Sequence, residues 1–249
     1  MTTHRNALVT GAGGGIGAAT ARLLAERGAN VWMTYADNAD GAERTAAQCR
    51  ARGVEAVASQ LDLRDPESVA QLFAAIGERW GCLHTVVNNA GACPYTAWHD
   101  ITLDEWDAVL EINARGTFAS IRSSIPLLRA ADGDRCIVNV ASLAGQVGGV
   151  STSVHYAASK GAVLAITRSF ARLLAPEAIR VNAVSPGPIA TSITAHLSDD
   201  ARSGLAAAVP LRRLGQAEEV AHAVALLASP DASFTTGATY DVNGGLRID

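Results

Sequence analysis

Two side chains with the spacing for proton-transfer chemistry are Tyr156 and Lys160. They stand four residues apart in a stretch with helical apolar spacing, so both project from one face of the expected helix. A phenol with a pKa of about 10 is a poor base at neutral pH, but a nearby ammonium favours the phenolate and lowers that pKa. The pair could give and take a proton. Isolated, such a pair is more often an ordinary feature of a helix surface.

Two further polar residues fall where they could assist. Ser142 follows a predicted strand at 136–141 and so stands at the carboxyl edge of a sheet, where doubly wound folds bind ligands. Its hydroxyl could donate to a carbonyl oxygen and stabilise the charge that develops there, or could simply cap the strand end. Asn113 is polar in an otherwise apolar helical stretch and could hold a water against Lys160 or bond its own backbone. His155 points off the reactive face of the helix, and we do not expect it to be catalytic.

A glycine-rich segment joins the first predicted strand to the first predicted helix. Glycines allow a sharp turn and the close approach of a pyrophosphate to amides at a helix N-terminus, where the helix dipole also favours anions. The alternative is a merely flexible turn, but the position between strand and helix favours dinucleotide binding. The segment reads Thr10-Gly11-Ala12-Gly13-Gly14-Gly15-Ile16-Gly17.

The end of the second predicted strand offers candidates for binding the adenosine. Asp37 lies 20 residues after Gly17, where an acid would accept hydrogen bonds from ribose hydroxyls and repel a 2′-phosphate. It could equally start the turn into the next helix. The glycine-rich segment and the neighbours of Tyr35 contain no Lys or Arg to clamp an extra phosphate, so NAD is favoured slightly over NADP. Asp62, followed by Leu63, could bond the adenine edge or open its loop.

The composition limits the classes of protein. The chain has 249 residues, 49% of them apolar and 18% charged, with a net charge of -4, which favours one domain over 1–249 and disfavours binding to nucleic acid. An N-terminus without a signal-peptide pattern, and the lack of any apolar run long enough to span a bilayer, predict a cytoplasmic protein that binds no membrane. No zinc-ligand spacing occurs, so we expect no metal and four reduced cysteines, Cys49, Cys82, Cys93 and Cys136.

Short apolar runs alternate with longer segments of helical periodicity along the whole chain. This pattern predicts an α/β fold, a doubly wound parallel sheet with helices on both faces. The one long irregular stretch, 187–214, is a candidate substrate lid. Strands are predicted at 7–10, 30–35, 55–58, 85–88, 136–141, 180–184 and 239–242, and helices at 16–27, 40–52, 66–80, 103–129, 154–174 and 217–228.

These motifs, in this order, resemble the short-chain dehydrogenase/reductase family over nearly the full length of the chain. The resembling segments are Thr10-Gly11-x-x-x-Gly15-Ile16-Gly17, Asn88-Asn89-Ala90-Gly91, Asn113, Ser142, Tyr156-Ala157-Ala158-Ser159-Lys160 and Pro186-Gly187-Pro188-Ile189-Ala190-Thr191.

The resemblance implies a Rossmann-like seven-stranded sheet in the order 3-2-1-4-5-6-7, a homotetramer or dimer, and a ketone–alcohol oxidoreductase using NAD(H) or NADP(H). Tyr156 would transfer the proton, Lys160 would bind the nicotinamide ribose, Ser142 would polarise the carbonyl and Asn113 would support a proton relay. Hydride transfer belongs to the cofactor. The expected cofactor contacts are Gly11, Gly13, Gly14, Gly15, Ile16, Gly17, Tyr35, Asp37, Asp62, Leu63, Asn89, Ala90, Gly91, Tyr156, Lys160, Pro186, Gly187, Ile189 and Thr191.

Within the family, the chain is most similar to 3-oxoacyl-carrier-protein reductases and related ketoreductases. An acidic carrier protein would favour a basic docking patch, yet Glu177 follows the catalytic helix, so this reading is the runner-up; Arg168 and Arg172 could still contribute. NADP-using relatives often have a basic residue at the position of Gly14, and NAD-using relatives often have Asp at that of Tyr35. We expect 93–98, 146–153, His155 and 193–209 to shape the substrate site. A catalytically idle dinucleotide-binding sensor is a more remote alternative, because it would not need the four polar residues.

Overall fold

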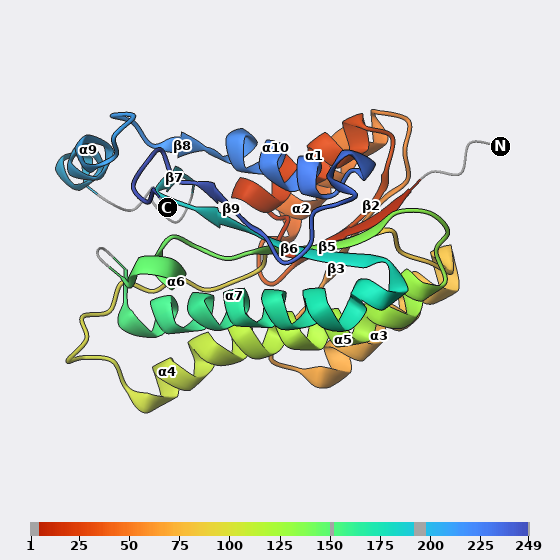
Figure 1. Ribbon diagram of the computed structural model, residues 1–249, viewed down its shortest axis with the longest axis horizontal. Helices are drawn as coiled ribbons and strands as arrows, with labels where there is room; N and C mark the ends of the chain where they lie inside the picture. The colour runs from red at the N-terminus through yellow and green to blue at the C-terminus, as the bar shows by residue number, and fades with distance from the viewer. Residues whose placement is uncertain (1–4, 150–151, 192–197, 249) are drawn as a thin grey trace.

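A parallel sheet forms the centre of the computed structural model, which describes residues 5–149, 152–191 and 198–248 (Figure 1). Its strand order is β3-β2-β1-β4-β5-β6-β9, which confirms the predicted seven-stranded order. The last strand is β9 because two short strands, β7 (Ile189–Ala190) and β8 (Gly215–Gln216), pair separately with each other. The main strands are β1 (Asn6–Val9), β2 (Asn30–Tyr35), β3 (Ala56–Gln60), β4 (Thr85–Asn88), β5 (Arg135–Val140), β6 (Ile179–Pro186) and β9 (Thr239–Val242).

Helices cover both faces of this sheet. Figure 1 shows α1 (Gly15–Glu26), α2 (Ala39–Arg50) and α10 (Ala217–Leu227) on one face, with α3 (Pro66–Trp80), α5 (Gly116–Arg129) and α7 (Val154–Leu174) on the other. The shorter helical elements are α4 (Leu103–Leu110), α6 (Ala144–Val147), α9 (Asp199–Ala208) and 3-10 turns at Ala175–Glu177 and Pro230–Ala232.

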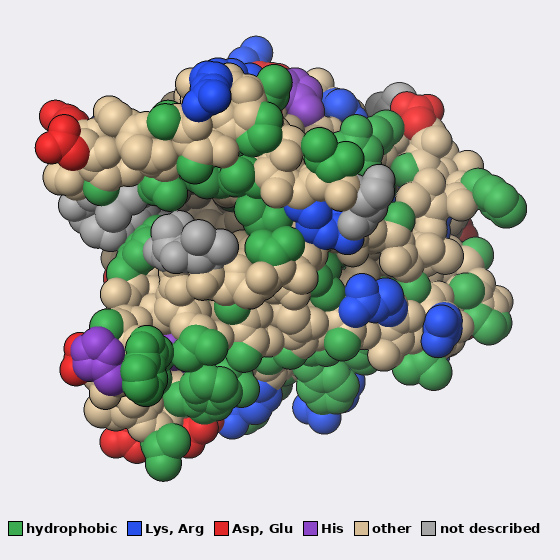
Figure 2. Space-filling view, turned by 60° about the vertical axis from the view of Figure 1, so that its left-hand side comes forward, with side chains coloured by type: hydrophobic (Ala, Val, Ile, Leu, Met, Phe, Trp, Pro, Cys, Tyr) green, Lys and Arg blue, Asp and Glu red, His purple; other side chains and the backbone are tan. Residues whose placement is uncertain are grey.

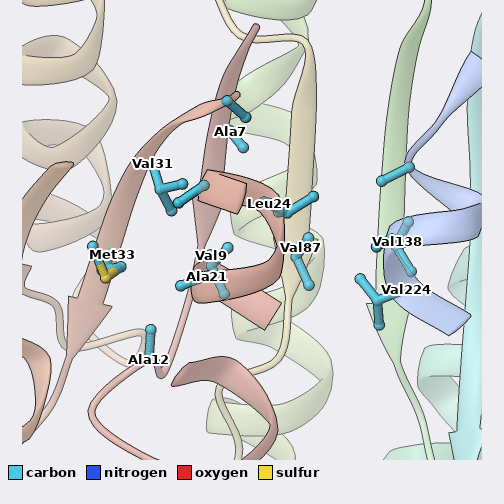
Figure 3. Close-up of a cluster of buried hydrophobic side chains, with 14 of the residues drawn as sticks. Ala7, Val9, Ala12, Ala21, Leu24, Val31, Met33, Val87, Val138 and Val224 are labelled. Carbon is cyan, nitrogen blue, oxygen red and sulfur yellow. The ribbon is translucent and has the colours of Figure 1, made fainter. Parts of the chain in front are cut away.

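The strands are apolar on both sides because each face has its own core. Val9 packs under α1 and α10, whereas its neighbour Leu8 packs among the residues of α3, α5 and α7. Figure 3 shows the first of these clusters, with Val9 and Val87 of the sheet facing Ala21 and Leu24 of α1. The lack of hydrophobic alternation in the sequence therefore reflects burial on both faces.

The predicted helix at 103–129 is interrupted. After α4 the chain forms a π-helical segment, Glu111–Arg115, before continuing as α5. Apolar spacing alone does not distinguish a π-helical turn from an α-helical one, so the sequence offered no sign of it. The segment contains Asn113, which is buried.

Thr102 and Glu105 have the spacing of a capping box, but the box forms only in part. Thr102 Oγ1 accepts from the Glu105 backbone N–H at 3.1 Å, which caps α4. The Glu105 carboxylate, however, accepts a hydrogen bond from Thr96 Oγ1 at 2.5 Å, in the segment before the helix. This carboxylate therefore binds the β4–α4 connection.

The irregular stretch at 187–214 begins with β7 and ends with α9 and the approach to β8. Residues 192–197, which include the start of the 193–209 stretch expected to shape the substrate site, lie outside the described residues. The role of residues 187–214 as a substrate lid stays a prediction. In the described part of the chain, no helix is both long and apolar enough to cross a membrane.

Candidate active site

The residues singled out from the sequence gather at the carboxyl ends of β1, β4, β5 and β6. There they surround a cavity of about 310 Å³. Figure 2 views the molecule from this side, and its surface is hollowed between the upper part that carries α9 and the lower part that carries α4. The predicted residues among those lining the cavity are Ile16, Asn89, Gly91, Ser142, Tyr156, Lys160, Pro186, Gly187, Ile189 and Thr191.

The glycine-rich turn is packed tightly against the segment after β4. Gly11 has a φ of +68°, and a Cβ there would lie 2.8 Å from Ala90 Cα; at Gly17 a Cβ would lie 2.4 Å from the Gly11 carbonyl oxygen. Thr10 Oγ1 accepts from the backbone N–H groups of Asn89 and Ala90, each at 3.0 Å. Side chains at these two glycines would break up the turn.

The same turn fits a dinucleotide pyrophosphate. Helix α1 starts after Gly14 without a side-chain cap, so its first N–H groups are oriented to serve an anion. A Cβ at Gly14 would meet no atom within 4 Å, so the turn is open on that side, whereas Thr191 closes over Gly15 with Cγ2 3.3 Å from its Cβ position. The residues present are therefore compatible with a nicotinamide dinucleotide.

At the far end of the cradle, Asn38 links β2 to the glycine-rich turn. Its Nδ2 donates to the Gly13 carbonyl at 2.7 Å, while its Oδ1 accepts from Gly41 N at 3.0 Å and caps α2. Asp37 beside it is exposed and Tyr35 is half-buried. Asn38 therefore makes the turn into α2, and the binding of the ribose by Asp37 stays a prediction.

One cation near this end was missed from the sequence. Arg64 forms a fork to Asp62, with Nε at 3.0 Å and Nη2 at 2.8 Å, and its guanidinium lowers the pKa of that carboxyl. The negative charge of Asp37 also acts on Arg64. Arg64 follows β3, so only the pairing of β3 with β2 brings it to the end of β2. Leu63 packs at the Gly116 Cβ position, 2.8 Å from its own Cβ.

Lys160 is buried and donates from Nζ to the Val140 carbonyl at 2.8 Å. That carbonyl belongs to the last residue of β5, so the ammonium is held at the strand end two residues before Ser142. Burial lowers the pKa of Lys160 to about 8. A group that changes its charge near neutral pH therefore stands inside the cavity.

Tyr156 differs from the expectation of a phenol acidified by Lys160. Burial raises its pKa well above the ordinary value, the nearby Cys93 adds to this increase, and a hydrogen bond with Ser142 opposes it. Lys160 Nζ lies 5.9 Å from the centroid of the Tyr156 ring and is turned toward Val140. Desolvation of the phenol thus outweighs the ammonium here, and the phenol is protonated at neutral pH.

Ser142 lines the same cavity as Tyr156. Its hydroxyl accepts from Ala144 N at 3.1 Å and is close enough to the phenol to oppose the rise in the Tyr156 pKa. Two hydroxyl groups thus meet at one point of the cavity wall, where both could donate to a single oxygen atom of a substrate. Ser142 is therefore positioned both as a turn cap and beside the phenol.

The Asn113 side chain makes contacts that were not predicted from the sequence, and its role in holding a water against Lys160 stays a prediction. Its amide does not bond its own helix, but it donates to the Ala92 carbonyl and to Ser159 Oγ, both at 2.9 Å, and accepts from Ala92 N at 2.8 Å. Asn113 therefore joins the segment after β4 to α7, the helix that carries Tyr156 and Lys160. The Gly91 Cβ position lies 2.9 Å from its Oδ1 and 3.5 Å from Lys160 Nζ, so this glycine separates the two side chains.

The substrate side of the cavity contains a thiol and a second phenol. Cys93 and Tyr95 both line it, and Cys93 hydrogen-bonds both Tyr156 and Tyr95. Of the segments expected to shape this side, 146–153 supplies Val147, Gly148 and Thr152, and 193–209 supplies Leu205 and Ala208. Trp98 is 79% exposed and His155 is fully buried. From the sequence, Cys93 was expected to shape the substrate site only as part of the segment 93–98. Its contact with Tyr156 joins residues far apart in the chain, so residue spacing did not reveal it.

Comparisons with known proteins agree with this geometry. A family model described as enoyl-(acyl carrier protein) reductase matches residues 11–247. The 3-oxoacyl-[acyl-carrier-protein] reductase FabG of Staphylococcus aureus is 38% identical over 249 residues, covering 100% of both chains. The cis-4-hydroxycyclohexanecarboxylate dehydrogenase of Sinomonas cyclohexanicum is 44% identical over 243 residues, covering 97% of this chain and 96% of the relative.

A solved structure is also similar over nearly the full length. The blue fluorescent protein from a metagenomic library, in complex with NADPH, has a TM-score of 0.91 and 34% identity, covering 98% of each chain. Together with the sheet order, these matches show that the chain belongs to the short-chain dehydrogenase/reductase family. It is an oxidoreductase that acts on CH–OH or carbonyl groups.

Proposed function

We propose that this oxidoreductase interconverts a compact, largely apolar ketone and its secondary alcohol, with Tyr156 as the proton donor and acceptor. The observation that carries the proposal is that the Tyr156 and Ser142 hydroxyls line one cavity together with the buried ammonium of Lys160. Two converging donors suit an oxygen that gains negative charge, as a ketone oxygen does during reduction.

The chain's own residues divide the work as follows. Ser142 polarises the carbonyl oxygen, and Tyr156, protonated at neutral pH, gives that oxygen its proton. Lys160 holds the nicotinamide ribose hydroxyls, and Asn113 fixes the catalytic helix against the segment after β4. A nicotinamide bound in the cradle supplies or accepts the hydride. The raised pKa of Tyr156 favours the reducing direction, because oxidation requires the phenolate as proton acceptor and the raised pKa disfavours the phenolate.

For the cofactor we propose NAD(H) over NADP(H). Asp37, Asp62 and Arg64 at the adenosine end leave one net negative charge, and the neighbouring ion pair of Glu111 and Arg115 adds no net charge. The only cation among the first three is already bound in a fork by Asp62. A 2′-phosphate would meet the free carboxylate of Asp37. Binding of NADPH by the blue fluorescent protein relative supports the nicotinamide dinucleotide in general, not this preference.

The substrate class follows from the side chains around the two hydroxyls. Apart from Cys93 and Tyr95, the substrate side of the cavity is bounded mainly by aliphatic groups, which favour an apolar body. These aliphatic lining residues are Leu143, Val147, Pro188, Leu205 and Leu246.

The second candidate substrate is a 3-oxoacyl thioester on a carrier protein, which the 38% identity to FabG favours. The structure weakens one argument against it, because Glu177 is engaged in a fork with Arg129, at 2.5 and 2.7 Å. Its charge is therefore compensated. The cavity would still have to admit a pantetheine chain, so we rank this substrate second.

An absorbance screen at the nicotinamide band tests the substrate and the cofactor together. Purified protein is assayed with NADH and with NADPH against 3-oxoacyl thioesters, simple and cyclic ketones, sugars and steroids. We expect turnover of cyclic or other compact ketones, with NADH preferred. Turnover restricted to 3-oxoacyl thioesters would replace the first proposal by the second, and binding of NADH without turnover of any class would favour the idle sensor.

For the assembly, we propose a cytoplasmic homotetramer, or a dimer, of one domain per chain. Large apolar side chains on the outer faces support association, since some are adjacent, as the rings of Phe118 and Phe170 at 6.0 Å are, and contiguous exposed apolar patches mark interaction sites. The exposed side chains include Phe118 and Leu173 on α5 and α7 and, near the end of the chain, Phe234 and Ile248, which are 105% and 86% exposed. Size-exclusion chromatography with light scattering checks the state, and a monomer at micromolar concentration would contradict it.

A further inference from the structure

His155 is buried in an unusual way for a polar residue. It is 0% exposed, neither ring nitrogen has a hydrogen-bond partner among the described residues, and its ring stacks on Trp106 at 6.3 Å between centroids. A buried polar group without a partner costs free energy that an apolar side chain of similar size would not. Packing alone therefore does not explain an imidazole at this position.

The acidic group near this imidazole is the carboxylate of Glu105. His155 Nε2 lies 3.5 Å from Glu105 Oε1, so the two groups are in contact at a distance longer than an ordinary hydrogen bond. The same Oε1 accepts from Thr96 Oγ1 at 2.5 Å. One oxygen of Glu105 therefore connects the catalytic helix to the segment after β4.

A second connection joins the same two parts of the chain. Ser153 is the N-cap residue of α7, but its hydroxyl donates to the Pro94 carbonyl at 2.7 Å instead of capping the helix. Pro94 and Thr96 flank Tyr95, and Cys93 precedes them. Residues 93–96, which we call the cavity wall segment, are thus attached to the start of α7 at two points.

We infer that His155, Glu105 and Ser153 are positioning residues that hold the cavity wall segment against the catalytic helix. They keep Cys93 beside the phenols of Tyr156 and Tyr95, and so they set the shape of the cavity where the substrate body lies. His155 touches none of the reacting groups in this scheme. It acts through Glu105 and Thr96.

The rate of Cys93 alkylation by N-ethylmaleimide, followed by peptide mass spectrometry, reports on this segment without any substrate. Loss of the anchor should let Cys93 leave its two phenol partners. In Thr96→Val and in His155→Leu we expect Cys93 to be labelled about tenfold faster. Cys49 and Cys136, both buried in the core, serve as internal references in the same sample.

Matched variants separate anchoring from general stability. His155→Gln restores an amide donor toward Glu105 and should return the Cys93 rate to within a factor of about two of the parent. Thr167→Val removes hydrogen bonds from Asn139 and to the Val163 carbonyl elsewhere on α7. It should lower the melting temperature and leave the labelling of Cys93 relative to Cys49 unchanged.

The inference rests on the proposed function only because it treats the cavity as the substrate site. The labelling experiment does not depend on any enzymatic turnover. Should His155→Leu fail to fold, Thr96→Val tests the same link from the partly exposed side. Equal rates for Cys93 in the parent and a folded Thr96→Val would overturn the inference, as would parallel acceleration at Cys93, Cys49 and Cys136. If labelling is faster only at Cys93 in the variants, the anchor is supported. If the parent protein also fails every ketone assay, the proposed function is wrong while the anchor still holds.

Discussion

The side-chain amide of Asn113 forms a two-way pair of hydrogen bonds with the backbone of Ala92, at 2.8 and 2.9 Å, from inside a π-helical turn. The additional bond from Asn113 Nδ2 to Ser159 Oγ brings in the catalytic helix. A single amide thus fixes three segments that converge on the cavity, and the wider π turn lets its side chain reach them.

Replacing Asn113 by Ala should therefore affect both stability and turnover. Ala92 would lose its side-chain partner in a buried place, so we expect the free energy of unfolding to fall by about 2 kcal/mol. Turnover should fall more than about tenfold, because the catalytic helix loses its anchor. Urea unfolding and steady-state kinetics provide the measurements. Ser124→Ala, which removes a buried hydroxyl of α5 bonded to the Ile121 carbonyl, is the control and should leave turnover unchanged.

Removing the phenolic hydroxyl of Tyr156 should abolish turnover and spare cofactor binding. For Tyr156→Phe we expect a loss of at least about a thousandfold in kcat, since the proton donor is gone, with the dissociation constant for NADH within about threefold. Tyr95→Phe, which alters the other phenol bonded to Cys93, is the matched control and should keep most of the activity. Turnover by Tyr156→Phe at the parent rate would eliminate the assignment.

The pH dependence of reduction should reflect Lys160. Its pKa is lowered to about 8, so the ammonium is present below that pH and is lost as the pH rises through it. The phenol of Tyr156 stays protonated over the same range, because its pKa is raised. We therefore expect kcat/KM for reduction to decline above pH 8.

Titration of Cys93 is the competing cause of such a decline, since its thiol lies in the same wall. Burial raises the pKa of Cys93 above its ordinary value, which places its titration higher than that of Lys160. The decline should persist with the same midpoint in Cys93→Ser. A profile that is flat up to pH 10 in the parent would rule out a role for the Lys160 charge.

Cofactor preference should respond to Asp37. In Asp37→Arg, a cation replaces the free carboxylate near the ribose, so we expect the ratio of NADPH to NADH affinity to rise by about tenfold or more. Titration calorimetry with both cofactors gives the ratio. Asp40→Asn neutralises an acid in the first turn of α2 and should leave the ratio within about twofold. Tighter binding of NADPH than NADH by the parent would already contradict the preference.

The doubly wound parallel sheet could be predicted because it depends on patterns that are local in the chain, whereas the order of its strands was implied by the family resemblance. Runs that are apolar on both faces, separated by helical segments with short connections, permit few topologies. The glycine-rich turn was predictable for the same reason, since Gly11 and Gly17 are needed wherever backbone segments approach this closely.

The contacts of the polar side chains could not be read in the same way. Thr102 and Glu105 have the spacing of a capping box, yet the Glu105 carboxylate accepts its hydrogen bond from the Thr96 hydroxyl. Arg64 reaches the end of β2 through the pairing of two strands, and Asn113 reaches Ala92 through a π turn. These partners depend on long-range packing, which residue spacing does not encode.

The sequence by itself determined the sheet, the family and the residues available for chemistry, because residue types and their order set these directly. Only the tertiary structure decided the state of those residues. Tyr156 and Lys160 have the spacing that would place an ammonium beside a phenol and lower the phenol's pKa. In the fold, burial raises the pKa of Tyr156 instead, and Lys160 donates to the Val140 carbonyl. Desolvation depends on everything that packs around a group, so it appears only once the chain has folded.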